Sequence, residues 1–260
     1  MGKIVFLVGL LCIWSIAATL AAGASSLGRV TGQLQSAEVD SCRGIVSLWP
    51  ATERGAAALE SFNSVPPWVA EIAPDCSFVI EAEPGSYYLR GVLRTTAGSD
   101  WGPLRPGDLV FMSPDGAGQR LQVEVNADLP VAVGTQSSHW EFSGFPAQIE
   151  TGVTGRLVDS AKKPVAGLLV EAFGGPSMAN RPLAVSAPSD ADGRFQLRLA
   201  APETIYLQGR ETVGIGFPPL GSLFGIYGGK KAQAVTVKQG ERIDNLEIII
   251  GRRTAEPAVK

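Results

Sequence analysis

The residues Asp190-Ala191-Asp192-Gly193-Arg194-Phe195-Gln196-Leu197-Arg198-Leu199 decide the fold, because they join a tight turn to an alternating strand. Asp-Gly is a frequent hairpin-turn sequence, since glycine adopts a positive φ without strain. After it, the apolar positions 195, 197 and 199 alternate with the polar positions 194, 196 and 198. This period of two indicates a strand with one buried face.

The same pattern of short strands and turns extends over the chain. In the C-terminal half we expect strands over 153–158, 168–173, 204–209, 234–237 and 243–250; in the N-terminal half, over 28–34, 45–49, 78–83, 87–93 and 121–125. Only 52–62, with three alanines, indicates a short helix. The 31 glycines and 18 prolines suit many tight turns. Six or seven short strands in each half predict an all-β protein of two β-sandwiches.

An internal repeat supports this division. Val30-Thr31-Gly32-Gln33-Leu34 matches Val153-Thr154-Gly155-Arg156-Leu157, an offset of 123 positions. Tyr88-Leu89-Arg90-Gly91 matches Tyr206-Leu207-Gln208-Gly209 at an offset of 118. Similar offsets in chain order predict a diverged tandem duplication. We therefore expect one sandwich over 25–147, a second over 148–251, and a flexible basic tail over 252–260.

The N-terminus has the features of a secretory signal peptide. Lys3 precedes an apolar run over 4–18, and Ala22-Gly23-Ala24 matches the small-residue pattern at a cleavage site. The alternative is an uncleaved anchor, but the run is shorter than the roughly 20 residues that span a bilayer. We predict a signal peptide over 1–24 and an exported chain, periplasmic or at the cell surface, with no stable membrane span after cleavage.

Export changes the interpretation of the cysteines. The mature chain retains Cys42 and Cys76, and thiols in an oxidising compartment pair. We expect a Cys42–Cys76 disulfide that stabilises the first sandwich. The alternative is two buried free thiols, because cysteine also serves as a small apolar residue.

Further motifs give the second half a family resemblance. Gly155-Arg156-Leu157-Val158-Asp159 is followed by Pro164-Val165-Ala166-Gly167, by the turn at 190–195, and by Val235-Thr236-Val237-Lys238-Gln239-Gly240. Over 150–251 the chain resembles the carboxypeptidase regulatory-like domain family of small transthyretin-like, or prealbumin-like, β-sandwiches. The resemblance implies a non-catalytic companion domain of exported and surface proteins, and related sandwiches bind carbohydrate. The first half departs from the pattern, with Cys76 in place of Gly193.

Few residues suit a metal or a cofactor. The chain has one histidine and three cysteines, which leaves little material for a transition-metal site. Asp190 and Asp192 resemble the start of a calcium loop, because alternating carboxylates can converge on a hard cation. The further oxygen ligands of such a loop are missing, and a hairpin turn explains the same residues. We expect no cofactor and no metal, with Asp190 and Asp192 as weak candidates only.

Candidate catalytic groups also have simpler explanations. Ser160-Ala161-Lys162-Lys163 has the S-x-x-K spacing of penicillin-binding enzymes, but that chemistry needs a helix and Pro164 follows directly. His139, beside two serines, has no nucleophile-elbow motif nearby. Glu81 and Glu83 share a strand face and suit two solvated acids as well as a glycosidase pair. We therefore predict that the protein is not an enzyme.

Three tryptophans are the candidate ligand-binding residues. Trp68, Trp101 and Trp140 all stand in turn-rich sequence, which predicts loop positions. Exposed indoles stack on sugars or anchor protein partners, whereas buried ones close the end of a core. The sequence leaves both readings open.

Composition narrows the function. The formal charge is −3, 45% of the residues are hydrophobic and 18% are charged, a balance that argues against nucleic-acid binding. We expect an exported structural or protein-interaction protein, an accessory or assembly component of the cell envelope, with an envelope or surface protein as partner. The alternative is a carbohydrate-binding module whose loop tryptophans contact a polysaccharide.

Overall fold

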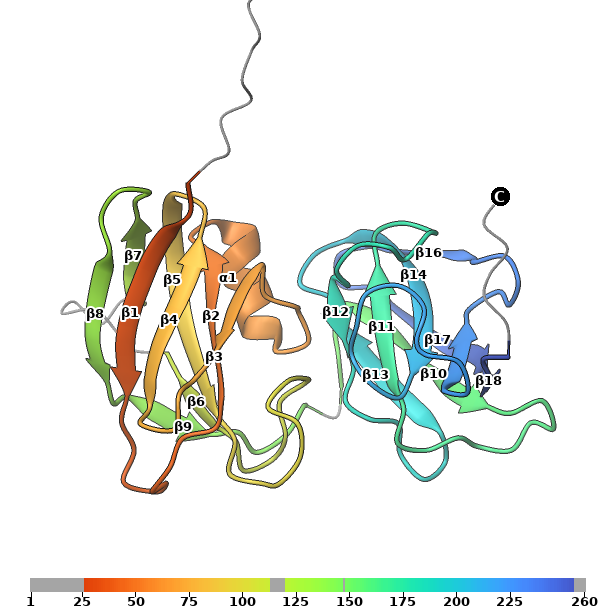
Figure 1. Ribbon diagram of the computed structural model, residues 1–260. Helices are drawn as coiled ribbons and strands as arrows, with labels where there is room; N and C mark the ends of the chain where they lie inside the picture. The colour runs from red at the N-terminus through yellow and green to blue at the C-terminus, as the bar shows by residue number, and fades with distance from the viewer. Residues whose placement is uncertain (1–25, 113–119, 147, 255–260) are drawn as a thin grey trace, which may run out of the picture.

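The computed structural model describes residues 26–112, 120–146 and 148–254, which form two β-sandwiches side by side (Figure 1). The all-β prediction is confirmed. The expected signal peptide at 1–24 lies outside the described residues. Within the described part of the chain, no helix has the length and apolar character that a membrane crossing requires.

The first unit consists of a small sheet packed on a larger one. The small sheet has the order β4-β1-β8, and the larger has the order β3-β2-β5-β6-β9, with β7 pairing β5 as well. The strand bounds are β1 Gly28–Leu34, β2 Gly44–Pro50, β3 Trp68–Glu71, β4 Ser77–Ala82, β5 Gly85–Leu93, β6 Leu109–Phe111, β7 Gln122–Val125, β8 Val131–Gln136 and β9 His139–Glu141. Only β1 and β8 pair in parallel; the other described pairs of this unit are antiparallel.

The second unit repeats this topology. Its small sheet has the order β13-β10-β17 and its larger sheet β12-β11-β14-β15-β18, with β16 pairing β14 as well. The bounds are β10 Gly152–Val158, β11 Leu169–Phe173, β12 Ala184–Val185, β13 Arg194–Arg198, β14 Glu203–Arg210, β15 Leu223–Ile226, β16 Ala234–Val237, β17 Arg242–Ile249 and β18 Gly251–Arg252. Again one pair, β10 with β17, is parallel, and its register shifts near the same point as in β1 with β8. Arg252, which the sequence analysis placed at the start of the tail, is the last residue of β18.

Apolar alternation gives each unit its own core between its two sheets. In β13, Phe195 and Leu197 are buried while Arg194 is exposed, as the period of two predicted. Fully burying each such side chain contributes roughly 1.5–3 kcal/mol. The residues below 2% exposure include Leu34, Leu48, Ile80 and Leu93 in the first core, and Leu157, Leu197, Ile205 and Ile248 in the second.

One turn is built identically in both units despite different residues. In the second unit, Gly193 has φ +72°, and its amide donates to the carbonyl of Asp190. In the first unit, Cys76 has φ +69°, and its amide donates to the carbonyl of Ala73. The carbonyls of Cys76 and Gly193 each accept from the small sheet's first strand, at the amides of residues 34 and 157. A cysteine thus holds the left-handed backbone that glycine adopts more easily.

A short helix covers the larger sheet of the first unit. It is α1, Glu53–Ser61, within the 52–62 segment where the sequence predicted a helix. The hydroxyl of Thr52 accepts the amide of Gly55 as the N-cap, and Phe62 ends the helix with φ +58°. Leu59 is its buried anchor. The helix lies on the side of the first unit that faces the second (Figure 1).

Candidate functional site

Backbone pairing joins the two units directly after α1. The segment 62–67 runs beside the edge strand β12. The amide of Val65 donates to the carbonyl of Leu183 at 3.0 Å, and the amide of Val185 donates to the carbonyl of Asn63 at 2.7 Å. The first unit therefore adds an extended segment to the sheet edge of the second, which is β-strand addition within one chain.

The Asn63 side chain completes this contact. It is buried, its Nδ2 donates to the carbonyl of Val185 at 2.9 Å, and its Oδ1 lies 3.4 Å from the amide of Arg198. An asparagine side chain both donates and accepts hydrogen bonds, so it can pair the buried carbonyl of Val185 on β12 and the amide of Arg198 on β13 at the same time. Asn63 is therefore the central polar residue of the junction.

Two further polar contacts lie around the junction. The guanidinium of Arg181 donates to the carbonyl of Pro66 at 2.9 Å. Arg54 of α1 forms an ion pair with Glu203 of β14, with Arg54 well exposed. Backbone, buried amide and surface charges thus link the same two units.

A cavity of about 290 Å³ lies beside the junction and is lined by both units. Its walls are mainly apolar, and Arg90 is its only basic lining residue. The residues that shape it are Phe62, Val69, Trp101 and Leu104 from the first unit, and Val185 and Val213 from the second. A mostly apolar hollow with few polar groups at a domain boundary is a common form of small-ligand site.

The structure separates the three candidate tryptophans. Trp101 lies in a loop, is 44% exposed, lines the cavity, and donates from Nε1 to Glu71 at 2.6 Å. Trp68 lies in β3, half-buried against the first core. Trp140 lies in β9, 39% exposed, with its ring edge-on to Phe62. The loop prediction is wrong for Trp68 and Trp140, because each begins or occupies a short strand at the border of the larger sheet.

Arg90 is a residue that the sequence did not single out. It lies in β5, 5% exposed, with its guanidinium 4.7 Å from the centre of the Trp49 ring and 5.8 Å from that of Phe62. Its Nη1 donates to the carbonyl of Leu59 at 2.9 Å. Burial, together with the like charge of Arg94, lowers the pKa of Arg90 to about 10, so the side chain stays cationic at neutral pH.

The second unit buries an acid on the matching face of its larger sheet. Burial raises the pKa of Glu171 to about 7, although the Gly214 amide, 2.9 Å from Oε1, and Arg210 oppose that rise. Arg210 Nη1 lies 3.5 Å from the carboxylate and donates to the carbonyls of Gly214 and Gly216. This cluster holds the loop after β14 against its own sheet.

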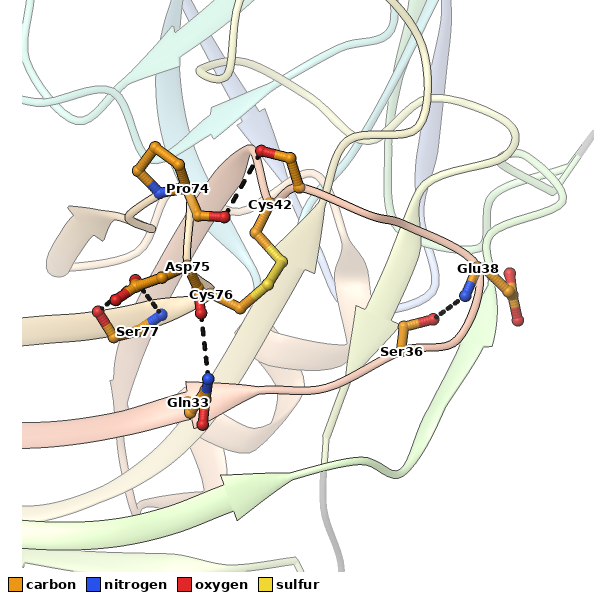
Figure 2. The surroundings of a disulfide bond; sticks show 9 residues. Gln33, Ser36, Glu38, Cys42, Pro74, Asp75, Cys76 and Ser77 are labelled. Carbon is orange, nitrogen blue, oxygen red and sulfur yellow. Dashed lines mark hydrogen bonds between the residues drawn. A yellow bond between two sulfur atoms is a disulfide. The ribbon is translucent and has the colours of Figure 1, made fainter.

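The disulfide joins Cys42 to Cys76 in the first unit (Figure 2). Their Cα atoms are 5.0 Å apart, within the range that a disulfide spans. The amide of Cys42 donates to the carbonyl of Pro74, and the Asp75 carboxylate accepts from the amide and hydroxyl of Ser77. These two Ser77 bonds lower the pKa of Asp75. The bond holds the chain entering β2 to the turn before β4.

The two aspartates of the possible calcium loop form a hairpin turn. Asp190 Oδ1 accepts the amides of Asp192 and Arg194 at 2.9 and 2.8 Å. The Asp192 carboxylate lies 3.9 Å from the Arg194 guanidinium. Across the described ranges, no cluster of three or more histidine, cysteine, aspartate or glutamate side chains is arranged to hold a metal.

The S-x-x-K segment also lies in a turn. The Asp159 carboxylate accepts the amides of Ala161 and Lys163, and Lys162 has φ +63°. The ammonium of Lys162 contacts Glu247 on β17. This turn does not provide the helical face on which a serine and a lysine act together.

His139 contacts a serine and an acid through the same ring nitrogen. Its Nε2 lies 3.4 Å from Ser36 Oγ and 3.2 Å from Glu38 Oε1, while Nδ1 lies 2.9 Å from the carbonyl of Ser137. A Ser-His-acid relay instead places the acid on the ring nitrogen opposite the serine. The arrangement therefore differs from a hydrolase triad.

The solved structures that resemble this chain do so at low sequence identity. No protein-family model and no curated protein matches the chain. Among solved structures, a streptococcal ancillary pilin is 12% identical, with a TM-score of 0.25, covering 87% of this chain and 63% of its own. The shaft pilin spaA from Lactobacillus rhamnosus GG is 11% identical, with a TM-score of 0.23, covering 88% and 100%. A putative adhesin from Bacteroides ovatus is 9% identical, with a TM-score of 0.23, covering 96% and 100%. At these values the likeness says nothing about function.

Proposed function

We propose that this chain is an exported, non-catalytic protein in which two docked β-sandwiches act as a structural or interaction unit of the cell envelope. The observation that carries the proposal is the junction, where the first unit adds a segment to β12. Its Asn63 lies between β12 and β13, which are edge strands of the two sheets of the second unit. Such pairing limits the freedom of two domains that a simple linker would leave mobile. A fixed arrangement of two domains is what a structural component of an assembly supplies.

Export and duplication belong to the same proposal. The signal-peptide pattern at 1–24 and the Cys42–Cys76 disulfide support a periplasmic or cell-surface location, because disulfides persist in oxidising compartments. The shared strand order and the matching turns at 73–76 and 190–193 support descent of both units from one ancestral domain. The carboxypeptidase regulatory-like family remains the proposed origin.

The proposed partner is another envelope protein that pairs with an open sheet edge. Strand β8 forms one edge of the small sheet in the first unit, and Ala132 on it is exposed. Unpaired edge strands accept a strand from a partner chain.

Crosslinking in the native organism tests this function. A photoreactive residue placed at Ala132 of the full chain should join one envelope protein in a fixed ratio, whereas the same residue at exposed Lys238 on the second unit should not. Fractionation of the same cells should find the chain outside the cytoplasm with its cysteines oxidised. A reduced, cytoplasmic chain, or equal random crosslinks from both positions, would overturn the proposal.

Carbohydrate binding is the second candidate, because Trp101 presents an exposed indole. It predicts that a polysaccharide changes tryptophan fluorescence and that Trp101→Ala removes the response. A flat response across glucans, chitin and peptidoglycan fragments would remove this candidate.

A further inference from the structure

Three arginines are buried within the described residues, and two of them have a carboxylate partner. Arg94 pairs with Asp108, with both side chains fully buried, and Arg210 lies against Glu171. Arg90, equally buried, forms no ion pair with any described residue. A buried cation without an anion is costly, so this arrangement requires an explanation.

The contacts of Arg90 compensate for only part of that cost. The Trp49 and Phe62 rings attract the guanidinium through their π-faces, and the Leu59 carbonyl accepts from Nη1. Its Nε has no hydrogen-bond partner among the described residues. Nε is therefore left without an acceptor, and no carboxylate balances the charge of the guanidinium among the described residues.

This same arginine lines the cavity at the junction. The cavity walls otherwise consist largely of aliphatic and aromatic side chains, including Phe62, Leu104, Val185 and Val213. We propose that the cavity binds a small organic carboxylate, with the carboxylate at Arg90 and its apolar body against these walls. Arginine suits this role because its fork of donors matches a carboxylate.

The size and place of the cavity define the ligand further. A volume of about 290 Å³ suits one aromatic ring or a short acyl chain, at the lower limit of ligand sites. Because Val185 and Val213 belong to the second unit, a bound acid contacts both sandwiches. It therefore favours the docked arrangement by linkage. Trp101, at the wall, reports occupancy through its fluorescence.

Calorimetry with matched acids and alcohols tests the site. The probes are 3-phenylpropionate and octanoate, each compared with the alcohol of the same skeleton, added to the full oxidised chain. We expect saturable binding of the acids, about tenfold or more tighter than that of the alcohols. Arg90→Met, which keeps an unbranched apolar stem and removes the charge and the donors, should remove this preference.

A second variant keeps the test decisive if Arg90→Met fails to fold. Val213→Trp fills the cavity from a surface loop, and Thr212→Trp beside it adds the same indole at an exposed position outside the lining. We expect Val213→Trp to abolish acid binding and Thr212→Trp to leave it unchanged. Equal loss in both variants, or no acid binding by wild type at millimolar concentrations, would overturn the proposal.

A peptide pair identifies the source of the carboxylate. Gly-Ser-Gly-Ser-Gly-Phe with a free C-terminus is compared with its amide. If the free peptide competes with octanoate and the amide does not, the site binds protein C-termini. If neither competes, the site binds free acids. Equal competition by both would contradict recognition of a carboxylate. None of these outcomes depends on the envelope partner proposed above, so the two proposals fail separately.

Discussion

The two units share one strand order but place opposite charges on the same face of the larger sheet. In the first, Ser47 lies opposite Arg90 where β2 pairs with β5; in the second, Glu171 lies opposite Gln208 where β11 pairs with β14. In both units, the residues between the two sheets are apolar, because this fold buries them in a core. The outer face is covered by α1 in one unit and by the loop after β14 in the other. The covering elements differ between the units, and so do the polar residues beneath them.

The units also differ in what stabilises a shared turn. The second uses Gly193, which adopts the left-handed backbone readily, whereas the first uses Cys76 and a disulfide. All four tryptophans after residue 24 lie within 49–140. Tryptophan fluorescence therefore originates in the first unit, while far-UV circular dichroism reports both. The two signals together allow the stability of the first unit to be compared with that of the whole chain.

The largest expected effect comes from the disulfide. Replacing both cysteines, Cys42→Ala with Cys76→Ala, should destabilise the first unit by about 3–4 kcal/mol, because the bond closes a loop of 34 residues. Urea unfolding followed by tryptophan fluorescence measures the loss. The control is the wild-type chain with and without reductant, which should show the same difference. An unchanged fluorescence midpoint would mean that the first unit does not depend on the bond.

The next effect concerns Glu171 and belongs to the second unit. Its pKa is raised from 4.5 to about 7 by folding, so the folded chain holds a proton that the unfolded chain has released between these values. The contribution of Glu171 to the free energy of unfolding should therefore be fully present below pH 4.5 and fall by about 3 kcal/mol as pH rises beyond 7. Glu171→Gln should remove that slope while keeping an acceptor for the Gly214 amide.

Far-UV circular dichroism in urea, at pH values from 4.5 to 8, tests this prediction. The informative quantity is the difference between wild type and Glu171→Gln at each pH, because other groups that titrate cancel in it. A difference that does not change with pH would show that Glu171 is not the group responsible.

Features of the fold that depend on neighbouring residues in the chain can be predicted from the sequence, whereas features that depend on contacts between distant segments cannot. The strands and the two-sandwich fold were readable because alternation, as at 194–199, records burial on one face. Trp68 and Trp140 were misplaced because β3 and β9 are too short to show a period. Arg90 was overlooked as a site residue because an arginine in an alternating strand indicates a solvated face. In the structure, Leu59 of α1 and the ring of Phe62 cover it.

The junction had no comparable signal. Asn63 and Val65 pair with a two-residue strand more than 100 positions away, and so short a pairing leaves no periodic pattern in either segment. The cavity likewise exists only where two units meet. A polar residue such as Asn63 between a helix end and two prolines was the sole hint, and it is typical of ordinary loops as well.

Gly193→Ala tests whether the turn of the second unit depends on glycine, where the first unit has Cys76. A Cβ at this position would lie 2.4 Å from the carbonyl oxygen of Leu157, and φ is +72°. We expect a loss of about 2 kcal/mol from the second unit, from the left-handed backbone and the contact together. The matched control is Gly167→Ala, whose added Cβ meets nothing within 4 Å although φ is +80°. Equal losses at the two positions would assign the whole effect to φ.

The smallest effects concern the coupling between the units. Asn63→Ala leaves the carbonyl of Val185 without its side-chain donor and should cost about 1–2 kcal/mol, because that group is buried. Arg54→Ala removes an ion pair whose arginine is 68% exposed and should cost about 0.5 kcal/mol or less. If buried pairing couples the sandwiches, only Asn63→Ala separates the fluorescence transition from the dichroism transition. A separation of equal size in Arg54→Ala would instead assign the coupling to surface charge, and raising the salt concentration would then separate the units in wild type too.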